Sequence, residues 1–101
     1  MERVTIVGVG LIGGSLGLAL KQHGFAGRIT GVGRRPTLDK ALGAGAIDEA
    51  QEELEAGVAR ADLIYLATPI ATILDLLPRV SRAAPAHALV TDAGSTKAQI
   101  A

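Results

Sequence analysis

The sequence has no cysteine and no tryptophan, and its only aromatic residues are Phe25 and Tyr65. The lack of cysteine excludes a disulfide framework and a thiolate metal site, and it is compatible with a reducing compartment. Ten lysines and arginines balance ten aspartates and glutamates, so the formal net charge is zero. A general nucleic-acid binder needs a basic field and stacking rings, and this chain has neither. We therefore expect no nucleic-acid partner.

Long apolar segments are also scarce. Residues 4–20 carry no charge, but five glycines fall within ten positions of this stretch, whereas a membrane-spanning helix needs about 20 apolar residues and tolerates glycine poorly. The charge of Glu2 cancels that of Arg3, and no small-x-small cleavage site follows the apolar stretch. Both features argue against a secretory signal. No histidine, aspartate and glutamate cluster has metal-ligand spacing. We expect a soluble, cytoplasmic protein without a membrane partner and without a metal.

What the chain does contain is enough apolar material for one core. It has 101 residues, of which 49% are hydrophobic and 20% are charged, and its mean hydropathy is +0.36. That composition offsets the entropy of ordering a compact chain, and the length suits one domain. Because the sequence stops where a helix has barely begun, we expect it to be truncated from a longer protein.

Short β-rich runs alternate with helical patterns along the whole chain. Strands are predicted at 4–7, 28–32, 63–67 and 88–91, with a brief third strand at 46–48. One helix is predicted from Leu11, with Gly24 at its stop position, and a second from a Thr37 cap to about Leu42, where Gly43 and Gly45 break it. The acidic residues 49–55 are predicted to start a third helix. A fourth has a helical face of Ile70, Ile73, Leu74 and Leu77 and is ended or restarted by Pro78, and a last one begins over 96–101. This alternation predicts an α/β, Rossmann-like doubly wound, mostly parallel sheet with helices on both faces.

A glycine-rich turn joins the first strand to the first helix. Residues 8–13 have the form G-x-G-x-x-G, with Gly8, Gly10 and Gly13 at the glycine positions and Leu11 and Ile12 between them. Such a turn lets a pyrophosphate approach free N–H groups at the helix start, where the helix dipole favours an anion. The alternative is that the glycines only permit close packing of strand and helix. We interpret residues 1–101 as a dinucleotide-binding domain.

The end of the second strand bears on the choice of cofactor. An acidic residue about 20 positions past the turn holds the ribose hydroxyls of NAD, but Gly33 stands there and is followed by Arg34 and Arg35. Guanidinium groups pair well with a 2′-phosphate. We predict NADP, with NAD as the second choice; an ordinary solvated turn is the alternative.

Three segments of the chain resemble the prephenate and arogenate dehydrogenases of tyrosine biosynthesis. They are residues 8–16 (GVGLIGGSL), 62–69 (DLIYLATP) and 91–97 (TDAGSTK). The resemblance covers essentially the whole chain, and it implies a nicotinamide-dependent oxidoreductase that decarboxylates prephenate or arogenate oxidatively. It also implies that the full-length enzyme is a homodimer and that its partner is this small-molecule substrate.

The resemblance also assigns roles to individual residues. Ser95 matches the family serine that orients the substrate, and Ala67, Thr68 and Pro69 match the turn under the cofactor. The family's catalytic histidine belongs to a His-Pro-Met-Ala-Gly motif that has no counterpart in residues 1–101. His23 and His87 are expected at the surface, away from the ligand crevice. We therefore expect this segment alone to bind cofactor and to turn over nothing.

Other interpretations remain open at this point. The chain suits another nicotinamide-dependent oxidoreductase, of the hydroxyacid or imine-reducing kind, whose catalytic residue lies elsewhere. It also suits a non-catalytic nucleotide-sensing module, in which the same turn binds a ligand and the output is a partner contact. A structural remnant with an empty glycine turn is the third alternative. Ser95 itself is open between orienting the substrate and capping the last helix.

Overall fold

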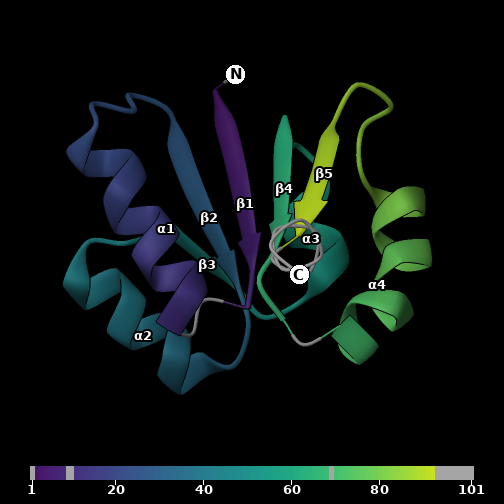
Figure 1. Cartoon of the computed structure of the whole chain (residues 1–101), viewed down its shortest axis with the longest axis horizontal. Coiled ribbons are helices and arrows are strands. Elements are labelled where there is room, and N and C mark those ends of the chain that lie inside the picture. Colours follow the sequence, from purple (N-terminus) through teal and green to yellow (C-terminus); the bar gives the residue numbers. More distant parts are fainter. Residues whose placement is uncertain (1, 9–10, 69, 93–101) are drawn as a thin grey trace, which may run out of the picture.

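The computed structural model describes residues 2–8, 11–68 and 70–92 (Figure 1). In these residues a parallel sheet has the strand order β3-β2-β1-β4-β5. The strands are β1 (Arg3–Val7), β2 (Arg28–Val32), β3 (Glu49–Gln51), β4 (Leu63–Leu66) and β5 (Leu89–Asp92), and the helices are α1 (Leu11–Gln22), α2 (Arg35–Ala44), α3 (Leu54–Val58) and α4 (Ile70–Ala83). The predicted doubly wound α/β fold is confirmed, and four of the five predicted strands lie where expected.

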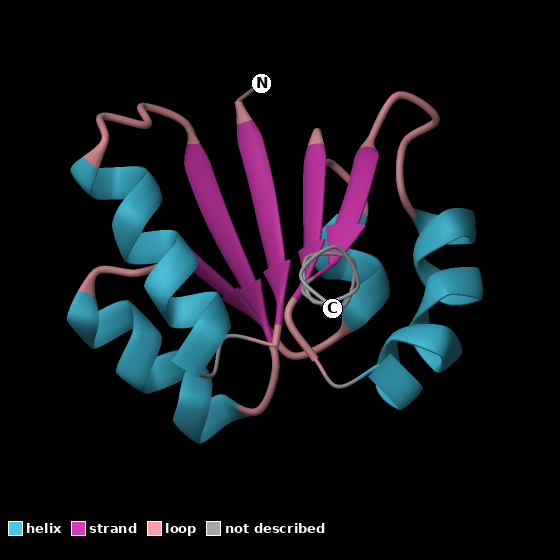
Figure 2. Ribbon diagram, viewed as in Figure 1, coloured by secondary structure: helices cyan, strands magenta, loops and turns pink. Residues whose placement is uncertain are grey.

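Helices cover both faces of the sheet, with α1 and α2 on one face and α3 and α4 on the other (Figure 2). Alternation along the strands explains this, because successive side chains of a strand point to opposite faces. Val4 and Ile6 of β1 pack in a cluster with Leu38 of α2. Val7, the next residue along, packs in the other cluster with Val58 of α3. The sheet is therefore buried on both sides, as parallel sheets usually are.

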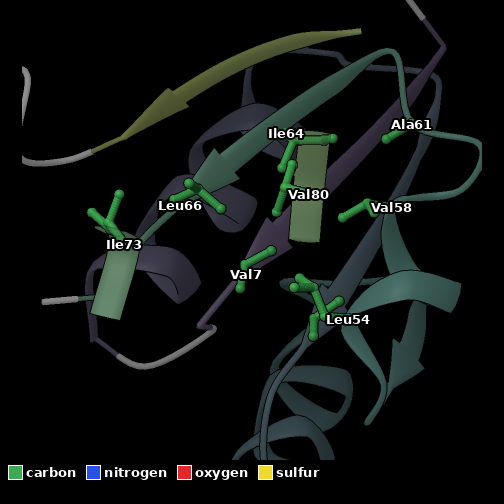
Figure 3. Packing of buried hydrophobic residues seen from close by; sticks show 9 residues of the cluster. Val7, Leu54, Val58, Ala61, Ile64, Leu66, Ile73 and Val80 are labelled. Carbon is green, nitrogen blue, oxygen red and sulfur yellow. The ribbon is translucent and has the colours of Figure 1, made fainter. Parts of the chain in front are cut away.

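Figure 3 shows the cluster under α3 and α4, where Ile64 and Leu66 of β4 meet Val58 and Val80. Ile64, Leu66, Val58 and Val80 are all fully buried. Burying a side chain of this size contributes about 1.5–3 kcal/mol, so this cluster is a main source of stability for the half of the sheet around β4.

The second helix begins earlier than predicted. We expected residues 33–36 to form a loop and Thr37 to cap the helix, but α2 starts at Arg35 with Arg34 as its N-cap residue. Pro36 lies in the first turn, where its fixed φ suits a helix and its missing N–H costs no hydrogen bond. The helix also runs through Gly43 and ends at Gly45, which has a φ of 77° and donates to the carbonyls of Ala41 and Leu42.

The third strand is displaced from its predicted position. Ala46 and Ile47 are buried but lie in a loop, while β3 occupies Glu49–Gln51. The acidic stretch 49–55 that we interpreted as the start of a helix is therefore an edge strand followed by a short helix. Glu49, the one glutamate of this strand, is tolerated there because β3 pairs only with β2 among the described residues and its side chains are half-buried or exposed.

The predicted face of α4 is correct at Ile73 but wrong at Leu74 and Leu77. Leu74 is 66% exposed and Leu77 is 38% exposed, while Ile73 and Val80 are buried. The helix continues through Pro78, which lies with Leu74 on the exposed side. There, water can solvate the carbonyl that proline leaves without a donor, so the helix is not ended.

Candidate functional site

The carboxyl edge of the sheet forms a crevice beside β1. The chain leaves β1 for α1 on one face and leaves β4 for α4 on the other, which makes this edge a topological switch point where open α/β sheets bind ligands. Gly8 ends β1 with a φ of 87°, a conformation that favours glycine. Its N–H donates to the carbonyl of Val32 over 2.7 Å, which fixes the turn against β2.

Helix α1 lies very close to that turn. A Cβ atom added to Gly13 would lie 2.4 Å from the carbonyl oxygen of Gly8 and 2.9 Å from Cγ2 of Ile6. Only glycine at position 13 permits this approach. The first turn of α1, with its unsatisfied N–H groups, is consequently held beside the end of β1, as the phosphate-turn hypothesis requires.

A hollow of about 440 Å³ opens at this edge on the α3 and α4 side. Gly8 and Gly33 line it from the strand ends, and Leu54 and Leu76 supply apolar walls. Thr68, which follows β4, also lines it. Thr68 Oγ1 is buried and has no hydrogen-bond partner among the described residues. A buried hydroxyl normally has a partner, so this oxygen is a candidate contact for a ligand.

The two arginines after β2 have different surroundings. Arg34 is exposed and forms no ion pair within the described part of the chain. Arg35 Nη1 lies 3.4 Å from Asp39 Oδ1, and Arg35 Nε lies 3.8 Å from Glu52 Oε1. Neither guanidinium lines the hollow itself, although both follow Gly33, which does. Of the two, Arg34 is the more available for a phosphate.

An ion pair at the rim of the hollow was missed by the sequence analysis. Arg79 of α4 donates to both carboxylate oxygens of Glu55 of α3, over 2.8 and 2.9 Å. The two residues are 24 positions apart, and only the packing of α3 against α4 brings them together, so no local pattern marks the pair. The hydrogen bonds from Arg79 lower the pKa of Glu55 to about 2.

This lowered pKa predicts a specific dependence of stability on pH. The pair contributes stability above the ordinary carboxyl pKa of about 4.5 and loses it as the pH falls towards 2. Glu55→Gln should therefore lower the urea midpoint at pH 6 and have little effect near pH 2. Both side chains are about half exposed, so we expect a small difference. Equal effects of the substitution at both pH values would contradict this origin.

Both histidines lie at the amino edge of the sheet, opposite the crevice. His23 follows the end of α1, and His87 precedes β5 with its Nε2 atom 2.8 Å from Asp62 Oδ1. The backbone N–H groups of Glu2 and Arg3 also donate to Asp62. The bonds from Glu2, His87 and Arg3 hold the pKa of this carboxyl well below its usual range. This cluster ties β1 to the start of β4 and has no access to the crevice.

The structure brings together several of the residues that the sequence predicted for the site. Gly8, Gly13 and Thr68 meet at the crevice, and the N–H of Ala67 donates to the carbonyl of Val7 over 2.8 Å. Leu11 and Ile12 begin α1. The predicted site residues Gly10, Pro69 and Ser95 lie outside the described residues.

The described residues contain neither a metal site nor a membrane-spanning helix. No group of three histidine, aspartate or glutamate side chains is placed to hold a metal ion in residues 2–8, 11–68 and 70–92. Across the same ranges, none of the helices has the length and apolar character needed to cross a bilayer.

Comparison with known families gives one match that covers most of the chain. Residues 16–101 match the model of the prephenate dehydrogenase nucleotide-binding domain. A prephenate dehydrogenase from Lactococcus lactis subsp. cremoris (strain MG1363) is 39% identical over 101 residues, which cover 99% of this chain and 28% of that protein.

Solved structures of the same kind are similar in fold. A prephenate dehydrogenase from A. aeolicus, in complex with hydroxyphenyl propionate and NAD+, has a TM-score of 0.84 and is 33% identical over 91% of this chain and 33% of that one. A Synechocystis arogenate dehydrogenase has a TM-score of 0.81 and is 35% identical over 90% of this chain and 32% of that one. The chain therefore spans about a third of the length of these relatives.

Proposed function

Since this chain belongs to the prephenate dehydrogenase family as its nucleotide-binding domain, we propose that it holds the nicotinamide cofactor of a prephenate or arogenate dehydrogenase. The enzyme it serves catalyses the oxidative decarboxylation of prephenate to 4-hydroxyphenylpyruvate or of arogenate to tyrosine. When bound, the cofactor accepts the hydride. This chain's own part is to bind and orient the dinucleotide at the carboxyl edge.

The observation that carries this proposal is the close approach of Gly13 to Gly8. It holds the first turn of α1 at the end of β1, where free N–H groups suit a pyrophosphate. Two further features fit a dinucleotide. Thr68 Oγ1 is a buried oxygen still lacking a partner in the described residues. Leu54 and Leu76 give the hollow an apolar part that suits a base, alongside its charged lining residues Glu52, Glu53, Glu55 and Arg79.

We propose NADP as the preferred cofactor. Gly33 offers no carboxylate to the adenosine ribose, and the exposed guanidinium of Arg34 follows it directly. A 2′-phosphate gains charge-assisted hydrogen bonds from a guanidinium. The A. aeolicus relative was solved with NAD+, so the preference needs a direct test on this chain.

The test measures the binding of NADP and NAD by calorimetry. Arg34→Ala should weaken NADP binding by about tenfold or more, because a hydrogen bond to a charged group contributes about 1.5–3 kcal/mol. NAD binding should stay within about twofold, since NAD lacks the 2′-phosphate.

Two variants serve as controls for charge and for position. Lys40→Ala removes an equal charge from the exposed surface of α2 and should leave both affinities unchanged. Arg35→Ala should cost less than Arg34→Ala, because Asp39 and Glu52 already engage Arg35. If NAD binds as tightly as NADP to the unsubstituted chain, the role proposed for Arg34 is wrong.

We also propose that the chain alone turns over no substrate. His23 and His87 lie at the amino edge, so no histidine of the described residues stands at the crevice to act as a base. The orienting role of Ser95, the homodimer and the cytoplasmic location stay predictions that rest on the family resemblance and on composition.

A further inference from the structure

A second hollow lies at the opposite, amino edge of the sheet, on the face that α3 covers. Its volume is about 300 Å³, well above what a single water molecule needs. Its walls come from β1, β2 and β3 and from the segment 56–61. Because the cofactor crevice is at the carboxyl ends of the same strands, the two hollows lie at opposite ends of the sheet.

Along β1 and β2, the side chains on this face change from apolar to polar at the hollow. On the α3 face, the residues near the carboxyl edge are Val7 of β1 and Val32 of β2, both buried and apolar. Towards the amino edge of β1 and β2 the same face carries Arg3, Thr5, Arg28 and Thr30, and the neighbouring edge strand β3 adds Glu49 and Gln51. Strands of a parallel sheet are usually apolar on both faces. The polar half-face of β1, β2 and β3 therefore departs from what the fold alone requires.

The shortness of α3 leaves this half-face open. The helix has five residues and is fixed near its end by Thr5, whose Oγ1 donates to the carbonyl of Gly57 over 2.7 Å. A Cβ atom on Gly57 would lie 2.2 Å from Cγ2 of Val32, so the helix touches the sheet there. Beyond Val58 the chain forms a turn that includes Arg60, and among the described residues no further helix covers the amino half of β1–β3 on this face.

The charges around the hollow are predominantly positive. Arg3 and Arg28 are partners in the register of β1 and β2, so two like charges stand side by side on one face, an arrangement that by itself destabilises a sheet. Arg60 adds a third guanidinium from the other wall, and Glu49 is the one carboxylate. Three positive charges and one negative charge leave a net charge of two.

Glu49 does not neutralise this group. Its Oε1 atom accepts from Arg28 Nε over 2.7 Å, which engages one guanidinium only. Arg3 and Arg60 have no ion-pair partner in the part of the chain that the structure describes. Thr30 and Gln51 add polar groups to the same walls. The hollow thus combines several hydrogen-bond donors with an excess of positive charge and has room for a small anion.

We propose that this hollow is a second anion site, which binds a phosphate group, either as inorganic phosphate or as a phosphate monoester. Guanidinium groups hold phosphate oxygens through paired, charge-assisted hydrogen bonds. The site is independent of the dinucleotide, because none of its lining residues lines the cofactor hollow. A bound phosphate also relieves the repulsion between Arg3 and Arg28.

The test is an NMR titration of the isotopically labelled 101-residue chain with sodium phosphate, with sodium chloride replaced so that ionic strength stays constant. We expect saturable shifts of the amide signals of Thr30, Gly57 and Arg60. Phosphate bound at the glycine turn instead shifts Gly8 and Gly13. A parallel titration with glycerol 3-phosphate distinguishes the two sources, since equal affinity shows that monoesters fit and much weaker binding shows a site for free phosphate.

Arg60→Gln should weaken phosphate binding at this hollow by about tenfold or more. Arg3→Gln is a second variant with the same expectation, and both side chains are exposed, so the fold should persist. Lys40→Gln is the matched control on α2, and it should bind phosphate like the original chain. All three should keep the original NADP affinity, which separates this proposal from the cofactor site. Shifts confined to Gly8 and Gly13, shifts that do not saturate, or full binding by both arginine variants would overturn it.

Discussion

Gly13→Ala is expected to abolish nucleotide binding, with a loss of at least about a hundredfold in the affinity for NADP. The added Cβ atom would lie 2.4 Å from the carbonyl oxygen of Gly8, and a backbone atom cannot rotate away as a side chain can. Helix α1 must therefore move off β1, which removes its N–H groups from the position where a pyrophosphate would lie. A hundredfold loss corresponds to about 2.7 kcal/mol, and isothermal titration calorimetry measures it directly.

Two further variants keep this result interpretable. Gly43→Ala makes the same substitution inside α2, where no atom lies within 4 Å of the new Cβ, and it should bind NADP like the original chain. Thr68→Val removes the buried hydroxyl while keeping its shape. Because that oxygen lacks a partner within the described ranges, the fold should lose no stability, whereas the nucleotide should bind several-fold more weakly. Undiminished binding by the Gly13 and Thr68 variants would place the nucleotide elsewhere.

The parts of this site that sequence predicts are those fixed by local geometry. The turn from Gly8 to Gly13 joins a strand to a helix within six residues, and the steric demand for glycine at both ends is visible in the pattern itself. The contact between Glu55 and Arg79 is different. It depends on how α3 and α4 pack against each other, and no local sequence pattern relates the two residues.

The same distinction holds for the fold. β1, β2, β4 and β5 are predictable because β-rich apolar runs bounded by turns specify buried strands. The error at β3 has a physical cause: the apolar residues Ala46 and Ile47 are buried by the loop packing under α1, not by pairing in the sheet. The true strand is polar because it lies at an edge and lines an open hollow, so its sequence has no signal of burial.

The largest loss of stability is expected from a substitution in α1 that faces the loop of Ala46 and Ile47. Gly17 of α1 faces it so closely that an added Cβ atom would lie 2.1 Å from the carbonyl oxygen of Ala46. Ala46 and Ile47 are buried, at 1% and 3% exposure, so the loop has little room to retreat. We expect Gly17→Ala to lower the free energy of unfolding by about 2–3 kcal/mol. For a domain of this size that is a fall in Tm of about 10–20 °C, measured by calorimetry and by urea titration.

Helix propensity alone predicts that Gly17→Ala raises the free energy of unfolding, so the comparison with Gly43→Ala is decisive. Alanine is favoured over glycine in a helix by about 0.5–1 kcal/mol, and at Gly43 nothing opposes that gain, so Gly43→Ala should raise the stability by this amount. At Gly17 the steric conflict must exceed the same gain. If Gly17→Ala also stabilised the chain, α1 would not lie against Ala46. Gly17 is one helical turn beyond Gly13 and away from the strand end, so folded Gly17→Ala should retain its affinity for NADP, which Gly13→Ala should lose.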